Sequence, residues 1–559
     1  MKNLVWDEDL RLYRKEQEKG FDYLDGGEDQ ILSYLQSIDD KSVFSDEVKR
    51  GATDWPSYYH FSVWRHNIMR PIKLGKEVNV LEVGAGCGAI TRYMGETGAN
   101  VVAVEGEVKR ARSVRERCAD LNNVTVCWAN VFDIEFDRQF DILTLIGVFE
   151  YSGRYAPFDK PFHDSLRKYR NLLADDGKIV IAIENRMGLK YFCGYNEDHF
   201  GKPYLGLEDK YGERDVNTFG KKEIKELLEQ AGFHDVTFFY PYPDYKFPQV
   251  ILSESAVSSP ELHTGDLISG LKAGSYSGVF RTTDMNYEMI CKMVAQNGLE
   301  ADLSNSFLII ASKKDAGNTQ IVDDELLAMQ FNFERKTPYH TVTEFLQKET
   351  EIIVKKKLAT QLPTNNDLIA HNLSDSPYYI GRNLGALLQE AIFKNRPQLF
   401  DSLLSKWIDF LIENAAVKKE GVNLKSELIP DYYDAIPKNF IIDKKENLYY
   451  FDNEWQLRQK TDIGFLMYRG SIRVYKDTPF FKNNYGNFYS FFVKLCTKAG
   501  IEKPTKNQVE QWTSLDTKIK KELSSKPPKY RKINWYRIKI DIKNKLRLAY
   551  KMIKNRLDI

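Results

Sequence analysis

The sequence lacks the features that would tie it to a membrane span or to an oxidising compartment. Its 559 residues contain no run of about eighteen consecutive apolar residues, the length that a helix needs to cross a bilayer. Charged residues already stand within the first ten positions, and no apolar segment of the kind that directs secretion follows them. Only six cysteines are present, and none forms a Cys-X-X-Cys pair. We therefore expect a reduced, cytoplasmic protein.

Histidine is also scarce, and neither sign of charge is in excess. The eight histidines are scattered without a His-X-X-X-His or His-Glu-X-X-His pattern, so the sequence predicts no zinc-type site. The 80 Lys and Arg residues nearly balance 79 Asp and Glu, which excludes a chain that binds polyanions along its whole length. Hydrophobic residues at 42% and charged residues at 28% are typical of a globular protein.

The near-zero net charge conceals a strongly basic end. Residues 518–559 hold 15 Lys and Arg against three Asp and Glu, so this end carries +12 and the rest of the chain −11. Within 500–559 a polar linker leads to basic residues interrupted at helical spacing by Leu546, Ala549, Tyr550, Ile553 and Leu557. Basic amphipathic helices bind anionic membranes, so we expect peripheral docking on the inner face of the cell membrane. A helix that packs on the acidic body of the chain is the alternative, and nucleic acid is not an expected partner.

Short apolar runs alternate with helical patterns between residues 60 and 314. Runs that predict buried strands lie at 78–83, 101–105, 124–129, 140–147, 178–184 and 306–314, and helical spacing falls at 107–120, 162–174 and 221–231. This alternation predicts a parallel sheet covered by helices on both faces. Residues 244–305 break the pattern and are predicted to be an insertion, and residues 1–59 are predicted to be a helical segment.

The sharpest motif is a glycine-rich turn directly after the first of these strands. Its sequence is Glu82-Val-Gly84-Ala-Gly86-Cys-Gly88, and its glycines let the backbone approach a ligand closely. A dinucleotide-binding turn would use Gly84, Gly86 and Ala89. The alternative pattern Glu-X-Gly-X-Gly-X-Gly is matched in full, and this match favours the second interpretation.

Further turns follow the next strands at the same edge of the predicted sheet. Glu105 closes the second strand, where its carboxylate can accept both hydroxyl hydrogens of a ribose. The turn Asn130-Val131-Phe132 follows the third strand and can contact an adenine ring. Gly147 and Glu150 follow the fourth strand, where cofactor and substrate meet in open α/β sheets.

Together these motifs resemble the class I S-adenosylmethionine-dependent methyltransferases over residues 60–314. The resemblance rests on the order of the glycine turn, Glu105, the strand FDILTLIG and the segment LLADDGKIVIAIEN. It implies an α/β fold with a Rossmann-like seven-stranded sheet and S-adenosylmethionine as cofactor. The cofactor site it implies consists of Glu82, Gly84, Gly86, Gly88, Glu105, Asn130, Val131, Phe132 and Gly147. The fourth strand ends in GVFEY rather than DPPY, NPPY or NLPY, which disfavours methylation of base amino groups.

Methyl transfer to a hydroxyl needs alignment of the reactants and benefits from a general base. Glu150, Glu184 and His199 are the candidates, and we expect Glu150 and His199 to be the catalytic residues. His199 lies in GYNEDHFGKPYLGLED, a composition that suits a loop over the strand ends. An upstream cluster is predicted to cap the cofactor or the acceptor, and it comprises Tyr58, Tyr59, His60, Arg65, Asn67 and Arg70.

A second group of chemically active residue types lies within 323–480. Asp434 and Asn439 match Asp-X-X-X-X-Asn, and Asp452 follows at the end of a predicted strand. Kinases use such a trio, an Asp that orients the acceptor hydroxyl and an Asn and an Asp that hold Mg²⁺. The arrangement resembles aminoglycoside-phosphotransferase-like kinases. The resemblance implies an α+β kinase-like domain that binds ATP and has Asp434 as its catalytic residue. It also implies that Asn439 and Asp452 hold Mg²⁺ and that a strand lysine lies within 353–357. A degenerate kinase-like domain and an unrelated fold remain alternatives.

The order of the two predicted domains resembles that of bacterial enzymes that modify O-antigen and related surface polysaccharides. The resemblance implies O-methylation of a sugar of such a polysaccharide or its precursor, with polysaccharide-assembly proteins among the partners. Two alternatives stay open. One is a bifunctional methyltransferase-kinase, or mainly a Mg-ATP phosphotransferase, that caps a glycan chain. The other is a non-catalytic, membrane-docked scaffold of an assembly complex.

Overall fold

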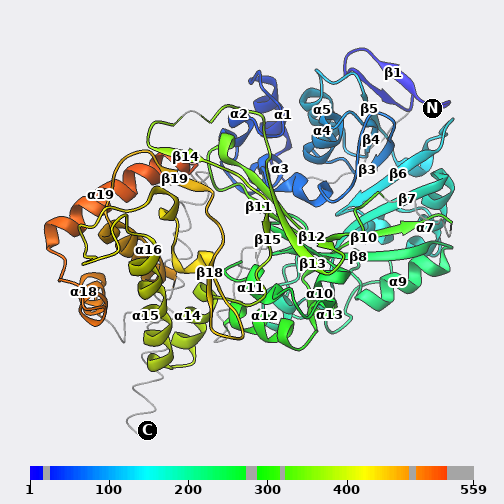
Figure 1. Ribbon diagram of the computed structural model, residues 1–559. Helices are drawn as coiled ribbons and strands as arrows, with labels where there is room; N and C mark the ends of the chain where they lie inside the picture. Colours follow the sequence, from blue (N-terminus) through cyan, green and yellow to red (C-terminus); the bar gives the residue numbers. More distant parts are fainter. Residues whose placement is uncertain (17–25, 272–285, 315–320, 365, 478–485, 526–559) are drawn as a thin grey trace, which may run out of the picture.

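The computed structural model describes residues 1–16, 26–271, 286–314, 321–364, 366–477 and 486–525. One sheet of fourteen strands runs through these residues (Figure 1). In the order in which they pair, its strands are β1 (Val5–Asp7), β2 (Leu12–Arg14), β5 (Val124–Trp128), β4 (Asn100–Glu105), β3 (Asn79–Val83), β6 (Phe140–Ile146), β7 (Leu173–Glu184), β10 (Ser306–Ser312), β8 (His234–Tyr242), β9 (Val250–Ser253), β11 (Leu326–Asn332), β12 (Thr341–Lys348), β13 (Glu351–Leu358) and β15 (Ser376–Pro377).

The seven strands from β5 to β8 form a Rossmann-like sheet. β5, β4, β3, β6 and β7 pair in parallel, and β10 runs antiparallel between β7 and β8. Parallel neighbours require long crossover connections, which is why helices separate these strands along the chain. The predicted α/β class and the mainly parallel sheet are therefore confirmed.

Helices cover both faces of this sheet. One face carries α1 (Glu28–Gln36), α2 (Asp46–Arg50), α3 (Trp55–Phe61), α4 (Ala89–Glu96) and α5 (Val108–Arg117), and the other carries α7 (Pro161–Leu172) and α9 (Lys221–Gln230). Successive side chains of a strand point to opposite faces, so β3 serves both cores. Leu81 and Val83 belong to the core under α7 and α9, and Val80 belongs to the core under α4 and α5.

The N-terminal segment differs from the sequence prediction at its start. The sequence predicts a helical segment over residues 1–59, but β1 and β2 form a hairpin before the first helix. β2 pairs in parallel with β5 and extends the sheet beyond its predicted edge. Each strand has three residues, too few for a periodic pattern, so the open edge of β5 decides this pairing.

The predicted insertion at 244–305 also contributes to the sheet. β9 pairs with β8 on one side and with β11 on the other, so the sheet continues into β11, β12 and β13. The predicted boundary between 314 and 323 thus falls between two strands of one sheet. The rest of the insertion contains α10 (Glu254–Ser258), α11 (Thr264–Leu267), α12 (Tyr287–Gln296) and α13 (Glu300–Leu303).

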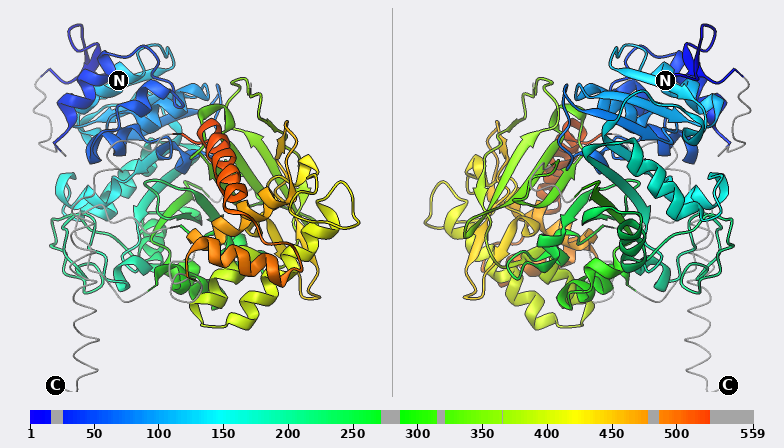
Figure 2. Two further views of the ribbon diagram at one scale, coloured as in Figure 1. Left: turned by 90° about the vertical axis from the view of Figure 1, so that its left-hand side faces the viewer. Right: turned by 90° about the vertical axis from the view of Figure 1, so that its right-hand side faces the viewer.

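A third core lies among the helices of the C-terminal half. These helices are α14 (Leu384–Phe393), α15 (Pro397–Asn414), α16 (Ile463–Asp477), α18 (Phe488–Lys498) and α19 (Lys506–Leu523). Two small sheets pack with them, β14 (Ile369–His371) with β19 (Trp455–Leu457), and β16 (Arg382–Asn383) with β17 (Phe440–Ile442) and β18 (Leu448–Tyr450). Figure 2 shows the yellow and orange elements of this half on the opposite side of the molecule from the blue N-terminal helices.

The described residues contain no helix that combines the length and the apolar character needed to cross a bilayer. The basic amphipathic helix predicted near the C-terminus falls on residues 526–559, which lie outside the described residues. Its docking on a membrane therefore stays a prediction.

Candidate active site

The carboxyl ends of β3, β4, β6 and β7 surround a cavity of about 380 Å³. This is the edge at which open α/β sheets bind their ligands. Residues of the predicted cofactor site line it, namely Glu82, Gly84, Gly86, Glu105, Asn130, Val131, Phe132 and Gly147. Glu150, Glu184 and His199 line the same cavity, so tertiary structure gathers the predicted cofactor and catalytic residues at one place.

The turn between β3 and α4 depends on its glycines. Gly84, Gly86 and Gly88 have φ of +73°, +55° and +77°, in the left-handed region that strains any residue with a β-carbon. A β-carbon on Gly84 would lie 2.5 Å from Val148 Cγ2, and one on Gly88 would lie 3.1 Å from Val114 Cα. Gly88 is absent from the cavity wall, so its role is to let α4 begin close to α5.

Glu105 is buried at the end of β4 and is held by the glycine turn. Its Oε2 accepts a hydrogen bond of 2.7 Å from the N–H of Gly86, and its Oε1 accepts one of 3.0 Å from the N–H of Glu107. Burial raises the pKa of Glu105, against the opposing effect of Arg110 and these two hydrogen bonds. A carboxylate has about four acceptor sites, so two remain for donors in the cavity.

Glu82 is the second-to-last residue of β3 and comes shortly before the glycine turn. It is buried, and the hydroxyl of Thr91 donates a hydrogen bond of 2.5 Å to its Oε2. Burial raises the pKa of Glu82 to about 8, although the bond from Thr91 lowers it. Glu82 is therefore protonated at neutral pH and gives the cavity floor a neutral polar group.

The turn Asn130-Val131-Phe132 after β5 forms one wall of the cavity. Asn130 Oδ1 accepts a hydrogen bond of 3.1 Å from the N–H of Phe132 and so caps the short helix η2 (Val131–Asp133). The ring of Phe132 packs against Phe158 and Tyr169. The amide of Asn130 thus shapes the turn, and the turn presents an apolar surface suited to a planar ring.

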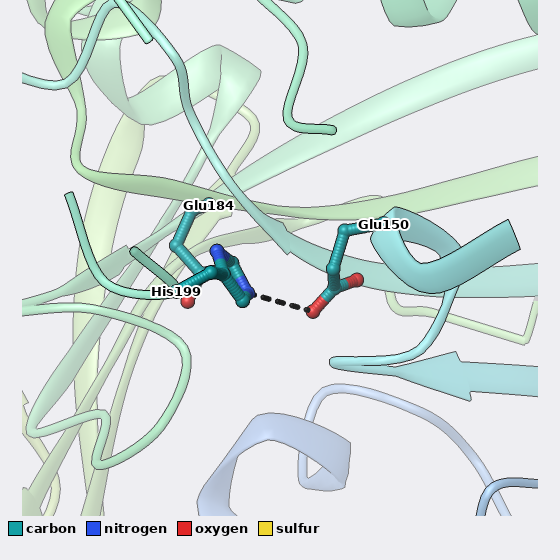
Figure 3. A group of neighbouring side chains, drawn as sticks. All are labelled: Glu150, Glu184 and His199. Atoms are coloured by element: carbon teal, nitrogen blue, oxygen red, sulfur yellow. Dashed lines mark ion pairs between the residues drawn. The ribbon is translucent and has the colours of Figure 1, made fainter. Parts of the chain in front are cut away.

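Glu150, Glu184 and His199 meet at one end of the cavity (Figure 3). Glu150 lies in the short helix η3 (Phe149–Tyr151) after β6, Glu184 ends β7, and His199 lies in the loop beyond α8 (Leu189–Phe192). His199 Nε2 is 3.8 Å from Glu150 Oε1 and 3.9 Å from Glu184 Oε2. Both carboxylates are fully buried, and the side chain of His199 is 10% exposed.

Charged neighbours hold the side chains of this group in place. Glu197 Oε1 lies 2.8 Å from His199 Nδ1, which holds the ring with Nε2 toward the two carboxylates. Lys246 pairs with Glu184 and with Asp198, and Lys190 Nζ lies 2.7 Å from Asp198. Burial alone would lower the pKa of His199, but the surrounding glutamates raise it well above its usual value.

The predicted capping cluster divides into two parts. Tyr59, His60 and Arg65 line the cavity. The guanidinium of Arg65 lies 4.5 Å from the centre of the Tyr59 ring, and its buried Nη1 has no hydrogen-bond partner among the described residues. An unsatisfied buried cation at a cavity wall suits an anionic group of a ligand.

The other three residues of that cluster have structural roles outside the cavity. Tyr58 packs against the ring of Phe247. Asn67 donates a hydrogen bond of 2.9 Å to the carbonyl of Pro248, and Arg70 donates one of 3.1 Å to Asn67. These contacts tie the N-terminal helices to the loop after β8.

Several cavity residues escape the sequence prediction. Tyr245 and Lys246 come from the loop between β8 and β9, inside the predicted insertion, and no motif marks them. Asp198 also lines the cavity, and Glu197 lies behind His199; both are next to His199 in the sequence, where the charged neighbourhood of a candidate base was a signal for them. Trp55 and Pro56 add an apolar wall from the start of α3.

The kinase-like residues also come together, at a separate place. Asn439 donates hydrogen bonds of 2.8 Å and 3.0 Å to the carbonyl and to Oδ2 of Asp434, and Asp452 pairs with Lys356 of β13. Asp434 also pairs with the buried Arg469, a partner that the sequence did not predict. The predicted trio therefore has its strand lysine, but its candidate catalytic Asp is held by an arginine.

Comparison with known proteins bears on the first of these two places. Residues 81–179 match the family model described as a methyltransferase domain. An uncharacterized methyltransferase of Staphylococcus carnosus is 30% identical over 139 residues, which cover 24% of this chain and 63% of that protein. The ribosomal RNA small subunit methyltransferase A of Lactiplantibacillus plantarum is 38% identical over 124 residues, 22% of this chain and 38% of that one.

Among solved structures, a Haemonchus contortus phosphoethanolamine N-methyltransferase 2 in complex with S-adenosyl-L-methionine aligns at 16% identity and a TM-score of 0.28. That alignment covers 52% of this chain and 57% of the other. The chain spans less than two thirds of the length of each of these relatives. The family match runs from β3 into β7 and includes the glycine turn, Glu105 and Glu150, so the similarity to methyltransferase domains falls on the segment that builds the cavity.

Proposed function

We propose that this protein is an S-adenosylmethionine-dependent methyltransferase that methylates a sugar hydroxyl of a surface polysaccharide or its precursor. One observation carries the proposal. A single cavity combines a glycine turn and a buried strand-end carboxylate, Glu105, with a polar group formed by Glu150, Glu184 and His199. The first part suits an adenosine-type cofactor, and the second suits the hydroxyl of an acceptor.

The residues of the cavity fit the cofactor. Gly84 and Gly86 let the turn run along the cavity wall at a positive φ, Glu105 keeps acceptor sites for ribose hydroxyls, and Arg65 Nη1, which has no hydrogen-bond partner among the described residues, can donate to a carboxylate. When S-adenosylmethionine is bound, its sulfonium supplies an activated methyl group. The protein then has to align the acceptor with that group and exclude water, which the buried walls of the cavity favour.

The acceptor oxygen would form its new bond to the methyl carbon while the carbon–sulfur bond breaks, so that the cofactor would leave as S-adenosylhomocysteine and the hydroxyl would give up its hydrogen. When the ring is neutral, His199 Nε2 is placed to accept that hydrogen, because Glu197 holds the opposite ring nitrogen and so orients the ring. Since the surrounding glutamates raise the pKa of His199, this neutral form is favoured by alkaline pH. Glu150 lies beside Nε2 at 3.8 Å and stabilises the positive charge that the ring then carries. These two residues are the proposed catalytic groups.

The sugar acceptor rests on the charged and hydrogen-bonding character of this end of the cavity and on the resemblance in domain order. Polar groups on the cavity wall such as Asp198, Lys246 and Tyr151 offer directional contacts that a polyhydroxylated ligand can satisfy. The basic end of the chain supports docking on the inner face of the membrane, next to lipid-linked glycans and the proteins that assemble them.

A mass spectrum of ligand that co-purifies with the protein, followed by incubation with labelled S-adenosylmethionine and candidate glycans, tests the proposal. We expect label on glycan oxygen, lost in Glu105→Ala and strongly reduced in His199→Gln. His163→Gln is the matched control, because His163 is a half-buried imidazole beside Asp164 outside the cavity. Labelled protein or RNA in place of glycan would refute the sugar acceptor, and a chain that does not bind the cofactor would favour the scaffold alternative.

A second function has support from the contact between Lys356 and Asp452. In kinases a strand lysine contacts the nucleotide phosphates and an aspartate holds the Mg²⁺ that bridges them, so both side chains belong to one site, and Lys356 and Asp452 are in contact here. The alternative function is a phosphotransferase activity in addition to methyl transfer. In it, the C-terminal half binds Mg-ATP through Lys356, Asn439 and Asp452, and Asp434 faces the hydroxyl to be phosphorylated. Calorimetry with ATP in the presence and absence of Mg²⁺ tests this. Binding that requires Mg²⁺ and is abolished in Asp452→Ala supports a kinase-like site, and no binding to the wild type excludes it.

A further inference from the structure

The group formed by Glu150, Glu184 and His199 offers three ligand atoms that point at one another. One oxygen of each carboxylate and His199 Nε2 all lie within 4.8 Å of each other, and Nε2 is 3.8 Å from Glu150 Oε1 and 3.9 Å from Glu184 Oε2. Ligand atoms bound at about 2.1 Å to one cation lie about 3 to 4.2 Å apart. The group therefore has nearly the spacing of a metal site, and small side-chain rotations would complete it.

The ligand atoms are also without hydrogen-bond partners. Neither carboxylate oxygen of Glu150 accepts a hydrogen bond among the described residues, although the residue is fully buried. Glu184 uses Oε1 for Lys246 and for a bond of 3.3 Å from the Tyr245 hydroxyl, and its Oε2 has no such partner. Buried carboxylate oxygens without donors are costly, so their convergence points to a missing positive ligand.

The neighbouring residues orient the ligand atoms as outer ligands do in metalloproteins. Glu197 accepts the hydrogen of His199 Nδ1, so Nε2 is the ring nitrogen that faces the group, and a cation bound there would take the place of a proton on Nε2. Lys246 pairs with Oε1 of Glu184, and the other oxygen, Oε2, faces His199 Nε2. A histidine held by a carboxylate is the usual support for a metal-ligating imidazole.

The charge of the surroundings favours a cation. Four carboxylates are packed together here, on Glu150, Glu184, Glu197 and Asp198, and among the described residues their ion pairs are with Lys190, Lys246 and His199. A cation on Nε2 would displace a proton from His199, and the four carboxylates would then face two ammonium groups and the cation. One divalent cation would complete this balance of charge.

We infer that Glu150, Glu184 and His199 bind a divalent cation at the acceptor end of the cavity. Two carboxylate oxygens and one imidazole nitrogen suit Mn²⁺, Fe²⁺ or Zn²⁺ better than Mg²⁺ or Ca²⁺. The inference rests on the proposed function in one respect. The coordination positions that these three residues leave free on the cation face the cavity, where an acceptor oxygen can bind. A cation on Nε2 takes the lone pair that would otherwise accept the hydrogen. The bound hydroxyl would then lose its hydrogen to water, because a divalent cation lowers the pKa of an oxygen bound to it.

The test uses the full chain, freed of metal with EDTA and titrated with MnCl₂ while free Mn²⁺ is followed by electron paramagnetic resonance. We expect one Mn²⁺ per chain, displaced by ZnCl₂. Glu150→Gln and His199→Gln should weaken binding by about 100-fold, and Glu197→Gln by about tenfold to 100-fold because it only orients the ligand. His163→Gln is the matched control and should bind as the wild type does.

Binding of S-adenosylhomocysteine, measured separately on each metal-free variant, shows that the cavity is folded and separates the two proposals. Absence of Mn²⁺ and Zn²⁺ binding to the wild type at about millimolar concentration overturns the cation site, as does unchanged binding in His199→Gln. If S-adenosylhomocysteine still binds in that case, the methyltransferase proposal stands without a metal. If Mn²⁺ binds through Glu150 and His199 but the cofactor analogue does not, the cation site stands and the proposed function fails.

Discussion

Glu105→Ala is the substitution that most directly tests the cofactor site. The Glu105 carboxylate has two acceptor sites in use, on the N–H groups of Gly86 and Glu107, and the others are open to the cavity. If those sites hold two ribose hydroxyls, the substitution removes two hydrogen bonds to a charged acceptor. Each such bond contributes about 1.5–3 kcal/mol.

Water that enters the space left by the side chain recovers part of this loss. We therefore expect a loss of about 2–4 kcal/mol in binding free energy, which corresponds to about a 30-fold to 1,000-fold rise in Kd. Glu105→Gln keeps one acceptor oxygen and should lose less, about tenfold. Both variants also leave an N–H of the turn with a poorer acceptor, so their free energy of unfolding should fall by about 1–2 kcal/mol.

Isothermal titration with S-adenosylhomocysteine measures the affinity, and urea unfolding shows that each variant is folded. Glu96→Ala and Glu96→Gln are the matched controls, because Glu96 lies at the far end of α4 and binds Arg92 outside the cavity. A folded Glu105→Ala variant whose Kd stays within about threefold of the wild type would show that ribose is not bound at this carboxylate.

Three further predictions follow from the geometry and the charge pattern. Gly84→Ala should lower the free energy of unfolding by about 1–3 kcal/mol, because it puts a β-carbon 2.5 Å from Val148 at a positive φ. The control is urea unfolding of Gly75→Ala, at a glycine whose added β-carbon would have no neighbour within 4 Å. Equal stability of the two variants would contradict the reasoning. Glu82 has a pKa of about 8 when folded and about 4.3 when unfolded, so the folded state holds the extra proton and stability falls by up to about 1.4 kcal/mol per pH unit from pH 5 to 8. Glu82→Gln should remove this slope, and wild-type and variant unfolding curves that remain parallel across the range would argue against a proton on Glu82. Deletion of 531–559 should abolish flotation with anionic liposomes, and flotation that persists would mean that another surface binds the membrane.

The central sheet could be predicted because its strands carry a local signal. Parallel strands covered on both faces need continuous apolar runs, and such runs stand in the sequence at five of the predicted positions that became β3, β4, β5, β6 and β7. The glycine turn and Glu105 were predictable for the same reason, since a tight turn and a strand end have fixed places relative to a strand. The hairpin β1–β2 and the strand β9 were not, because their three or four residues are too few for a period and gain their stability from the edges they pair with.

The chemistry at the acceptor end divides in the same way. The sequence marks His199 and Glu150 as titratable residues near strand ends, but nothing in it says that they lie 3.8 Å apart or that Glu184 joins them. Lys246 reaches Glu184 from the loop after β8, and Glu197 turns the imidazole, so the spacing of the group depends on the packing of four separate segments.

The sequence alone therefore determined the α/β class, the cofactor edge of the sheet and the charge contrast between the body and the end of the chain. These are properties of local periodicity, turn geometry and composition, which need no knowledge of distant contacts. Tertiary structure alone decided that one sheet runs from β1 to β15 and that buried carboxylates converge on one imidazole. Both depend on contacts between residues far apart in the chain, whose free energy exists only once the segments have packed together.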